Sequence, residues 1–416
     1  MPFSYARFVS FRNLEDSEVD TKAERIFLIG ENGQGKTNFL EALYYLCYGS
    51  SFRGSVDQQI PATGSRGFGL AAAWNSLGNS EDSELENGIS IRYDGQAKDI
   101  RLNGKSLKDR KELVFHNPAV VFCHEDFSFA AGDPERRRFF FDQCAGMLYP
   151  GYIDSLRSYK RILKQRNAAL KESAYDLLDV LDPQLVRFGL ALMEERRKLL
   201  RRFQKDFPRL YEYVSRLGRP VELAYASSWQ READFDGLLA HLGSRRESEI
   251  LYGTTRSGPH RDRWDFSSDE GSFTDRASTG QLRLLSLILR IIQASAVAGG
   301  EDMGEGADIA VGSDIAVRAE ANGGAEAAKG IKAADASDPQ PSGGRKPRWP
   351  ILLLDDVLLE LDVGRRRRFL ELLPPPGQGA QAFFTFLPEE PWTEYENGDT
   401  IVYRVHNGRF ENQKRL

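Results

Sequence analysis

The stretch Arg25–Thr37, RIFLIGENGQGKT, decides the fold class of this chain. An apolar run leads into Gly30, four free positions and then Gly35-Lys36-Thr37, and the residues that follow, NFLEALYYL, have the composition of a helix. Glycines let a backbone wrap a polyphosphate, and a helix that starts directly afterwards points its positive end at the charge. The pattern predicts a phosphate-binding P-loop between a buried strand and a helix. A simple glycine-rich turn is the alternative.

Each residue type in this loop suits a nucleotide. Lys36 would reach the outer phosphates and is one of two expected catalytic residues, while Thr37 would offer its hydroxyl oxygen to Mg²⁺. The expected cofactors are therefore ATP and Mg²⁺. The expected nucleotide-binding residues are Gly30, Glu31, Asn32, Gly33, Gln34, Gly35, Lys36, Thr37 and Asn38.

A second element lies near the other end of the chain, at Trp349–Asp362, WPILLLDDVLLELD. A strand buried on both faces of a parallel sheet is continuously apolar, and a carboxylate at its end can hold Mg²⁺ beside a nucleotide. We therefore predict a Walker B strand, with Asp355 on the metal and Asp356 as the second catalytic residue, facing the attacking water. An acidic pair that only caps a core strand is the alternative. The P-loop favours Walker B, since both elements belong at the carboxyl edge of one sheet.

A third element, Ala277–Gln281 followed by LRLLSLILRIIQ, resembles the signature sequence of the ABC ATPases. Hydroxyl and backbone donors at a helix N-terminus form an anion site, here suited to the γ-phosphate of ATP held by another head. A plain helix cap is the alternative. The order of P-loop, signature, Walker B and then Glu360-Leu361-Asp362 in the D-loop position favours the signature. The residues expected to act in trans are Ser278, Thr279, Gly280 and Gln281.

The distance between P-loop and signature separates the classes of ABC protein. In this chain the P-loop ends at Thr37 and the signature begins at Ala277. The segment between them is longer than the compact helical subdomain that a transporter has there and shorter than the coiled coil that an SMC protein has there. Residues from about 134 to 217 carry apolar positions at helical spacing, which predicts a short arm. The turn dipeptides Asp94-Gly95 and Asn103-Gly104 predict a β-meander. The expected fold is α/β, an ABC-type ATPase head with a mixed P-loop sheet and an antiparallel layer, plus a helical second lobe.

Three segments follow from this organisation. We expect residues 1–132 to form the N-terminal part of lobe I, residues 133–252 to form helical lobe II, and residues 253–416 to complete lobe I. The stretch at about 297–348 is rich in Gly, Ala and Asp and nearly without large apolar residues. Such a composition cannot bury a core, so it predicts a disordered low-complexity insertion.

Over nearly its whole length the chain resembles the RecF family of bacterial recombination mediators. The stretches that carry the resemblance are RFVSFRNLEDSEV, GENGQGKTNFLEALYYL, FCHEDFSFAAGDPERRRFFFD, YKRILKQRNAALK, SGPHRDR and LLLDDVLLELD. Two positions depart from the family pattern: Leu359, where a serine is frequent, and Thr279, where a basic residue or glycine is common. Neither departure removes a phosphate ligand.

The resemblance implies an ATPase of recombinational repair and replication restart. It implies dimerisation on ATP, binding to gapped DNA or to single-strand/double-strand junctions, the partners RecO and RecR, and help in loading the RecA recombinase. Transporter ATPases usually have glutamate where Asp356 stands. Because aspartate is one methylene shorter, it should hold the water less well, and we expect slow hydrolysis. The rival interpretations are a transport ATPase and a scaffold that uses ATP only to dimerise.

The net charge of −5 is unusual for a DNA-binding protein, but the distribution of charge matters more than the sum. Basic residues cluster in the expected arm and could neutralise phosphates. A solvated helix face is the alternative, and the resemblance favours DNA. The expected DNA-binding residues are Arg136, Arg137, Arg138, Lys160, Arg161 and Lys164.

Composition excludes several other classes. The 416 residues are 41% hydrophobic and can bury a large core. The three cysteines stand far apart, so neither a disulfide framework nor a zinc site is indicated. We find no apolar run near the ~20 residues of a membrane span and no signal peptide, so we expect a cytoplasmic protein without a membrane partner.

Overall fold

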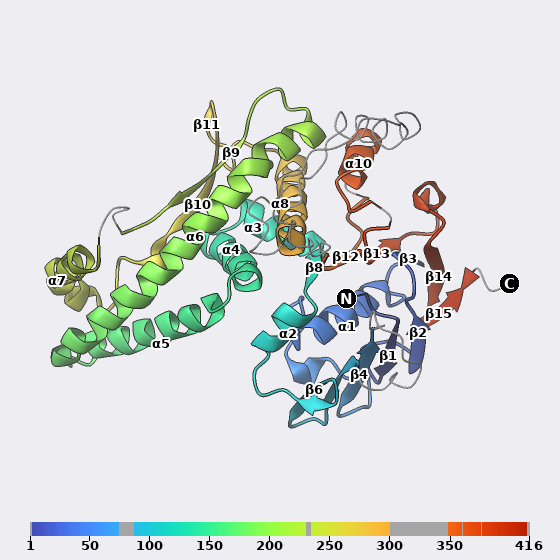
Figure 1. Cartoon of the computed structure of the whole chain (residues 1–416), viewed down its shortest axis with the longest axis horizontal. Coiled ribbons are helices and arrows are strands. Elements are labelled where there is room, and N and C mark those ends of the chain that lie inside the picture. Colours follow the sequence, from blue (N-terminus) through green and yellow to red (C-terminus); the bar gives the residue numbers. More distant parts are fainter. Residues whose placement is uncertain are drawn as a thin grey trace, which may run out of the picture.

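The computed structural model describes residues 2–74, 87–229, 234–299, 348–359, 361–375 and 377–413. Figure 1 shows a head built from both ends of the chain and a helical lobe that extends from it. The termini both belong to the head. The expected head with a mixed sheet, an antiparallel layer and a helical second lobe is confirmed.

The mixed sheet of the head has six strands and holds the P-loop. Its order is β15 (Arg409–Asn412), β14 (Thr400–His406), β3 (Arg25–Ile29), β13 (Ala382–Phe386), β12 (Ile351–Leu354) and β8 (Ala119–Phe122). Neighbours from β14 to β8 are parallel, and β15 is antiparallel to β14. The apolar runs of β8, β12 and β13 are buried throughout, as a parallel sheet covered on both faces requires.

A second six-stranded sheet is antiparallel. Its order is β2 (Ser17–Asp20), β1 (Tyr5–Val9), β4 (Phe68–Ala73), β5 (Gly88–Tyr93), β6 (Lys98–Leu102) and β7 (Lys105–Ser106). The two turn dipeptides join β5 to β6 and β6 to β7, with positive φ at Gly95, Asn103 and Gly104. Helix α1 (Lys36–Tyr48) shares one apolar core with both sheets. The antiparallel layer therefore covers the helix that follows the P-loop.

The helical lobe contains α4 (Pro134–Leu148), α5 (Tyr152–Lys171), α6 (Leu178–Ser215) and α7 (Phe235–Tyr252). Helices α5 and α6 form the arm at the left of Figure 1. Buried charges join its helices: Arg166 on α5 bonds to Asp182 on α6 at 2.6 Å and to Glu249 on α7 at 2.7 Å. All three side chains are almost completely buried.

The expected lobe boundary at residue 252 is wrong. Strand β9 (Glu222–Ala226) lies before it, but it pairs with β10 (Arg263–Ser268), which also pairs with β11 (Gly271–Ser272). Helix α8 (Thr279–Gly299) then shares the apolar core of α6. The helical lobe therefore continues past residue 252. The sequence pattern had assigned β9 and β10 to different lobes, but the two strands pair with each other.

The remaining elements complete the two lobes. They are α2 (Lys111–His116), α3 (Phe127–Ala131), α10 (Val363–Leu370) and short 3-10 turns at Asp57–Gln59, His124–Asp126, Tyr175–Leu177, Pro259–Arg261 and Trp392–Tyr395. Helix α8 continues to Gly299, so the expected insertion does not begin at 297. Residues 300–347 of that expected insertion lie outside the described residues.

One described helix, α8, is long and apolar enough to cross a membrane, with a mean hydropathy of 1.5 over its best window. The search for apolar runs in the sequence overlooked it. Because 89% of that window is buried inside the protein, α8 has the character of a core helix.

Candidate nucleotide site

The P-loop connects β3 to α1 and has the backbone shape that its glycines allow. Gly33 and Gly35 adopt φ values of +79° and +113°, in the left-handed region that disfavours a side chain. Helix α1 begins at Lys36, directly after Gly35. The loop therefore delivers the N-terminus of α1 at the carboxyl edge of the mixed sheet, where ligands of such sheets bind.

The C-terminal hairpin supports this loop from behind. The amide N–H of Asn407 donates to Gln34 Oε1 at 2.7 Å, and that of Gly408 donates to the carbonyl of Gln34 at 2.8 Å. A methyl group at Gly30 would lie 2.4 Å from the carbonyl oxygen of Val405. Only glycine therefore fits at position 30. Sequence reasoning did not assign this support, although the Asn407-Gly408 dipeptide is a hairpin signal.

Lys36 lies inside the loop and is buried. Its ammonium donates to the carbonyl oxygen of Gly30 and, at 3.1 Å, to that of Glu31. Neighbouring Glu31, Asn32 and Gly33 are exposed, while Gln34, Thr37 and Asn38 are partly buried. The lysine charge thus lies where a phosphate chain held by the loop would pass.

Thr37 and the Walker B strand meet although 318 positions separate them. Thr37 Oγ1 donates to Asp355 Oδ1 at 2.9 Å. Burial raises the pKa of Asp355 to about 6, and the negative charge of Asp356 contributes next. Hydroxyl and carboxylate oxygens are the ligands that Mg²⁺ prefers, so Thr37 and Asp355 fit the expected metal.

Asp356 is held by Thr385 at the end of β13. Its amide N–H donates to Thr385 Oγ1 at 2.8 Å, and that hydroxyl lies 2.7 Å from Asp356 Oδ1. The φ of Asp356 is +51°, which is uncommon for a residue with a side chain. Such strained positions are found where surrounding contacts fix them, often at functional sites.

Sequence reasoning missed three residues here: Thr385, Glu125 and Glu390. Glu125 follows β8, the parallel neighbour of β12, and its charge contributes to the raised pKa of Asp355. Glu390 follows β13; burial raises its pKa first, and the charge of Asp356 adds to that effect. The strand-end argument that selected Asp355 would have found Glu125 after the apolar run AVVF.

The signature residues lie at the start of α8. The amide N–H of Gln281 donates to Ser278 Oγ at 3.3 Å, and that of Ser278 donates to Gln281 Oε1 at 2.8 Å. Ser278 is therefore a helix cap, as the alternative interpretation stated. Ser278, Thr279 and Gly280 are nevertheless exposed, so their position allows contact with a second molecule. Glu360 of the expected D-loop lies outside the described residues.

No family model matches this chain. A curated protein of Treponema pallidum, named DNA replication and repair protein RecF, is 34% identical over 96% of this chain and 98% of its own length. The chain belongs to the RecF family. Proteins of the same name from a Synechococcus strain and from Leptospira interrogans are 29% and 28% identical over 89% and 97% of the chain.

Solved structures agree with RecF membership at the level of fold. The chain is similar to a structure described as the recombination mediator protein RecF-ATP in the RecFOR pathway, with a TM-score of 0.75, 23% identity, and coverage of 99% of this chain and 97% of that one. It also resembles an SMC head bound to the C-terminal winged-helix domain of ScpA, with a TM-score of 0.52, 12% identity and coverage of 99% and 97%.

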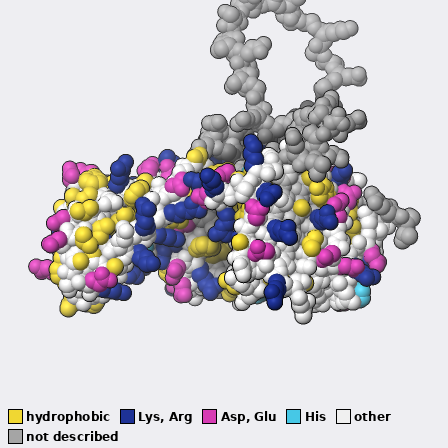
Figure 2. Space-filling model, turned by 90° about the horizontal axis from the view of Figure 1, so that it is seen from below, with side chains coloured by type: hydrophobic (Ala, Val, Ile, Leu, Met, Phe, Trp, Pro, Cys, Tyr) yellow, Lys and Arg dark blue, Asp and Glu magenta, His cyan; other side chains and the backbone are white. Residues whose placement is uncertain are grey.

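The basic residues that a RecF protein could offer to DNA divide into two groups. Arg136 on α4 and Lys160, Arg161 and Lys164 on α5 are exposed. Figure 2 shows Lys and Arg side chains gathered between arm and head on the face seen from below. These four residues remain candidates for phosphate contacts.

Arg137 and Arg138 do not fit that role. Arg137 is buried and donates to the carbonyl of Trp264 at 3.0 Å, and Arg138 donates to that of Asp262 at 2.9 Å. Helix α4 packs against β10, so these two arginines join lobe elements. The expectation that Arg137 contacts DNA is therefore wrong, and Arg138 is half-buried.

Proposed function

We propose that this protein is an ATP-dependent DNA-binding protein of recombinational repair and replication restart. The contact between Thr37 and Asp355 carries the proposal, because it joins a P-loop to a Walker B carboxylate across the whole chain. Membership of the RecF family supports the biological role, since the curated relatives are named DNA replication and repair proteins.

The site residues suit phosphoryl chemistry. The backbone of residues 30–35 and the N-terminus of α1 would bind the phosphates, and Lys36 would neutralise the outer ones. Thr37 and Asp355 would hold Mg²⁺, which when bound neutralises charge on the phosphates. Asp356 would orient the attacking water, with Thr385 fixing the position of its carboxylate. Catalysis would then consist of positioning and charge stabilisation.

Slow hydrolysis follows from the length of Asp356. Its carboxylate is one methylene short of the glutamate that transport ATPases use, and its bond to Thr385 holds it toward β13. ATP would then time the release of a DNA-bound protein and would not drive movement. RecF membership gives no support to the rival interpretation as a transport ATPase.

Two copies would complete one another's sites. Ser278, Thr279 and Gly280 are exposed. The side chains of Ser278 and Gln281 bond to each other's backbone amide, and the carbonyl of Gln281 accepts from the Tyr211 hydroxyl. A signature in this position can clamp a γ-phosphate only when a second molecule brings it there. ATP binding would therefore drive formation of a homodimer.

DNA and protein partners are proposed on the family. The arm residues Lys160, Arg161 and Lys164, with Arg136, would contact phosphates of gapped DNA or a junction. A similar structure is described as belonging to the RecFOR pathway, which supports RecO and RecR as partners and RecA loading as the outcome. We infer from these tasks that the protein acts in the cytoplasm.

Paired variants test the proposal. Lys36→Arg should lose ATP binding and dimerisation, while Asp356→Asn should dimerise, hydrolyse ATP more slowly than the wild type and stay longer on gapped DNA. Sedimentation with ATP and Mg²⁺ reports the dimer, and a chase with competitor DNA reports the residence time. Release of Asp356→Asn at the normal rate would favour a scaffold that uses ATP only to dimerise. A monomer at saturating ATP would contradict the mechanism.

A further inference from the structure

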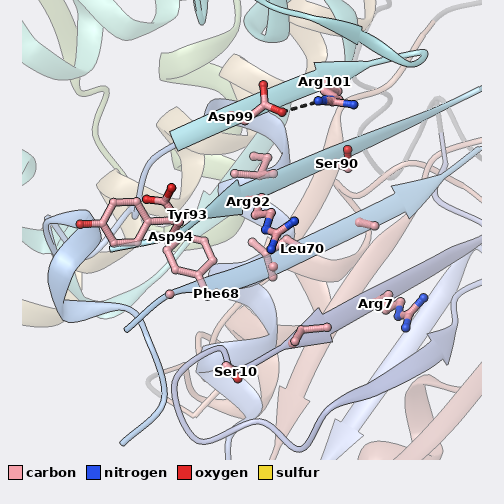
Figure 3. Close-up of a pocket in the computed structure, with 15 residues that line it drawn as sticks. Arg7, Ser10, Phe68, Leu70, Ser90, Arg92, Tyr93, Asp94, Asp99 and Arg101 are labelled. Carbon is pink, nitrogen blue, oxygen red and sulfur yellow. Dashed lines mark hydrogen bonds and ion pairs between the residues drawn. The ribbon is translucent and has the colours of Figure 1, made fainter. Parts of the chain in front are cut away.

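The turn that follows β1 lies against the P-loop. Ser10 begins this turn, at the rim of the cavity that Figure 3 shows on the antiparallel sheet. Two apolar side chains anchor the turn: Phe11 packs edge-on against Tyr45 of α1, and Leu14 is buried. Asn13 stands between these anchors, and its side chain is exposed. The fold therefore fixes the position of Asn13 without burying it.

The side-chain amide of Asn13 joins two parts of the nucleotide site. Its Nδ2 donates to the carbonyl oxygen of Gly33 in the P-loop at 3.0 Å. Its Oδ1 accepts from Nδ2 of Asn38, in the first turn of α1, at 2.7 Å. Because a carbonyl oxygen only accepts, Nδ2 must face Gly33, and the orientation of the amide is set by its partners. Asn13 therefore bridges the loop and the helix that follows it.

Further polar contacts hold Asn38 in turn. Its Oδ1 accepts from Nη1 of Arg53 at 3.1 Å, and Arg53 lies 3.7 Å from the carboxylate of Glu41. Glu41 is completely buried on α1 and accepts from Arg12 at 2.7 Å and 3.0 Å. Because Arg12 directly precedes Asn13, these contacts close into a ring. The two asparagine amides are therefore held from both ends.

The backbone of the turn is strained where the ring closes. Arg12 has a φ of +55° and Ser10 a φ of +50°, in a region that is uncommon for residues with a side chain. The guanidinium of Arg12 also donates to the carbonyl of Gln59 at 2.8 Å and to Ser55 Oγ at 2.7 Å. Such strain persists only where surrounding contacts over-determine it, and it clusters at functional sites. The turn is therefore held in one conformation, with Asn13 directed at the P-loop.

Two carbonyl oxygens of the P-loop are bound from outside the loop. That of Gly33 accepts from Asn13, and that of Gln34 accepts from the N–H of Gly408 at 2.8 Å. The carbonyl of Gly408 accepts in turn from the N–H of Glu15 at 3.1 Å, so the turn after β1 also supports the hairpin. A loop that binds phosphate through its N–H groups must direct its carbonyl oxygens away from the anion. Donors placed outside the loop stabilise that conformation.

We propose that Asn13 is a positioning residue of the nucleotide site. Its hydrogen bond holds the carbonyl of Gly33 away from the phosphates and thereby keeps the neighbouring N–H groups directed at them. Asn13 acts through the loop and not through contact with the nucleotide. The inference rests on the proposed function and deepens it, because it concerns the shape of the same P-loop.

Equilibrium binding of ATP to the full chain, with Mg²⁺, tests this role in Asn13→Ala. Loss of one neutral hydrogen bond should weaken ATP binding about three- to tenfold. Steady-state hydrolysis should show the loss in KM with kcat unchanged, since Lys36, Asp355 and Asp356 keep their contacts. Because Asn13 is exposed, the variant should melt close to the wild-type temperature. Gln96→Ala, at an exposed position in the turn between β5 and β6, is the control and should bind ATP like the wild type.

Asn13→Asp separates the bond to Gly33 from the bond to Asn38. The aspartate keeps an acceptor for the Asn38 amide, but it offers the carbonyl of Gly33 a carboxylate oxygen in place of a donor. This variant should bind ATP at least as weakly as Asn13→Ala. Wild-type affinity in Asn13→Asp would overturn the proposal, because the donor to Gly33 would then be dispensable.

Competition by ATP and by inorganic tripolyphosphate against a fluorescent ATP analogue distinguishes positioning from direct contact. A residue that only shapes the loop should weaken both ligands by the same factor. A loss confined to ATP would assign Asn13 to a contact with the nucleoside and overturn the proposal, as would a loss in kcat with KM unchanged. If wild-type protein binds neither ligand, the proposed function fails. If it binds ATP and Asn13→Ala binds ATP equally well, only the role of Asn13 fails.

Discussion

Asp356 and Thr385 hold one another through two hydrogen bonds: the amide of Asp356 donates to the threonine hydroxyl, and that hydroxyl donates to the aspartate carboxylate. Asp356 follows β12, and Thr385 lies near the end of β13, the parallel neighbour of β12. The short acidic side chain of Asp356, on a strained backbone, is thereby fixed at the carboxyl edge of the mixed sheet, where helix α1 begins. The position of the proposed catalytic group is therefore set by a residue outside the familiar motifs.

Thr385→Val should slow ATP hydrolysis without weakening ATP binding. Valine keeps the shape of threonine but removes both bonds to Asp356, and a lost hydrogen bond of ~1 to 1.5 kcal/mol corresponds to roughly tenfold in rate. Steady-state kinetics should show the loss in kcat with KM unchanged. Thr385→Ser keeps the hydroxyl and should stay near the wild-type rate. Equal loss in both variants would show that Thr385 acts through packing alone.

Asp355→Asn should remove most of the Mg²⁺ dependence of ATP binding. The amide is the size of the carboxylate but carries no charge. The proposed metal would therefore keep the neutral hydroxyl of Thr37 and lose the negative charge of Asp355. Titration of a fluorescent ATP analogue with Mg²⁺ and with EDTA measures the effect, and wild-type protein in EDTA should behave like the variant. Asp236→Asn, at an exposed position in the first turn of α7, serves as control. Wild-type Mg²⁺ dependence in Asp355→Asn would remove this residue from the metal site.

His260 should make stability fall below neutral pH. Burial lowers the pKa of His260 to about 4 from the ordinary 6.5, and the contact of its ring with the carbonyl of Thr255 at 3.2 Å opposes that shift only in part. The other ring nitrogen lies 2.8 Å from the Tyr159 hydroxyl. The unfolded chain therefore binds the proton first as pH falls. This contribution is complete above about pH 6.5 and is lost toward pH 4, by at most about 3 kcal/mol.

Urea denaturation of wild type and His260→Gln between pH 7 and pH 4.5 measures that loss. As the pH falls, the free energy of unfolding should decrease less steeply in His260→Gln than in the wild type. His406→Gln, at an exposed position, should show the same decrease as the wild type. Parallel curves for wild type and His260→Gln would contradict the prediction. The contacts with Tyr159 and Thr255 also assign this histidine to shaping its loop.

Arg166→Ala should loosen the base of the arm. It would leave the carboxylates of Asp182 and Glu249 buried with fewer partners, and breaking a buried ion pair costs about 3 to 5 kcal/mol. Chemical denaturation should show that loss, whereas Lys160→Ala, exposed on the same helix, should change stability by less than about 0.5 kcal/mol. Equal stability of the two variants would mean that the arm does not depend on this cluster.

The sequence predicted the P-loop and Walker B strand because their signals are local. Gly30 to Thr37 specifies a turn and a helix start, and ILLL before Asp355 specifies a buried strand. Thr385 could not be found in this way. Nothing local to its strand, QAFFTF, shows which carboxylates Thr385 contacts.

Errors arose where distant segments decide the outcome. Arg137 sits in a run of three arginines that predicts a basic surface, and only the packing of α4 on β10 reveals that its guanidinium is buried. The lobe boundary failed for a similar reason, since β9 and β10 pair across it. The sequence shows which side chains a helix carries. Which face of the helix is buried depends on the elements that pack against it, and these come from distant parts of the chain.

The strand before the P-loop also has a consequence for biosynthesis. Arg25 pairs with Ala382 on one side and with Thr400 on the other, so β3 finds both neighbours only after Thr400 has been synthesised. At about 5 to 20 residues per second, the ribosome needs tens of seconds to supply them. A chain released early would carry the complete P-loop motif and still lack the surface that supports it. Nucleotide binding in this protein therefore requires that synthesis has passed the strands that flank β3.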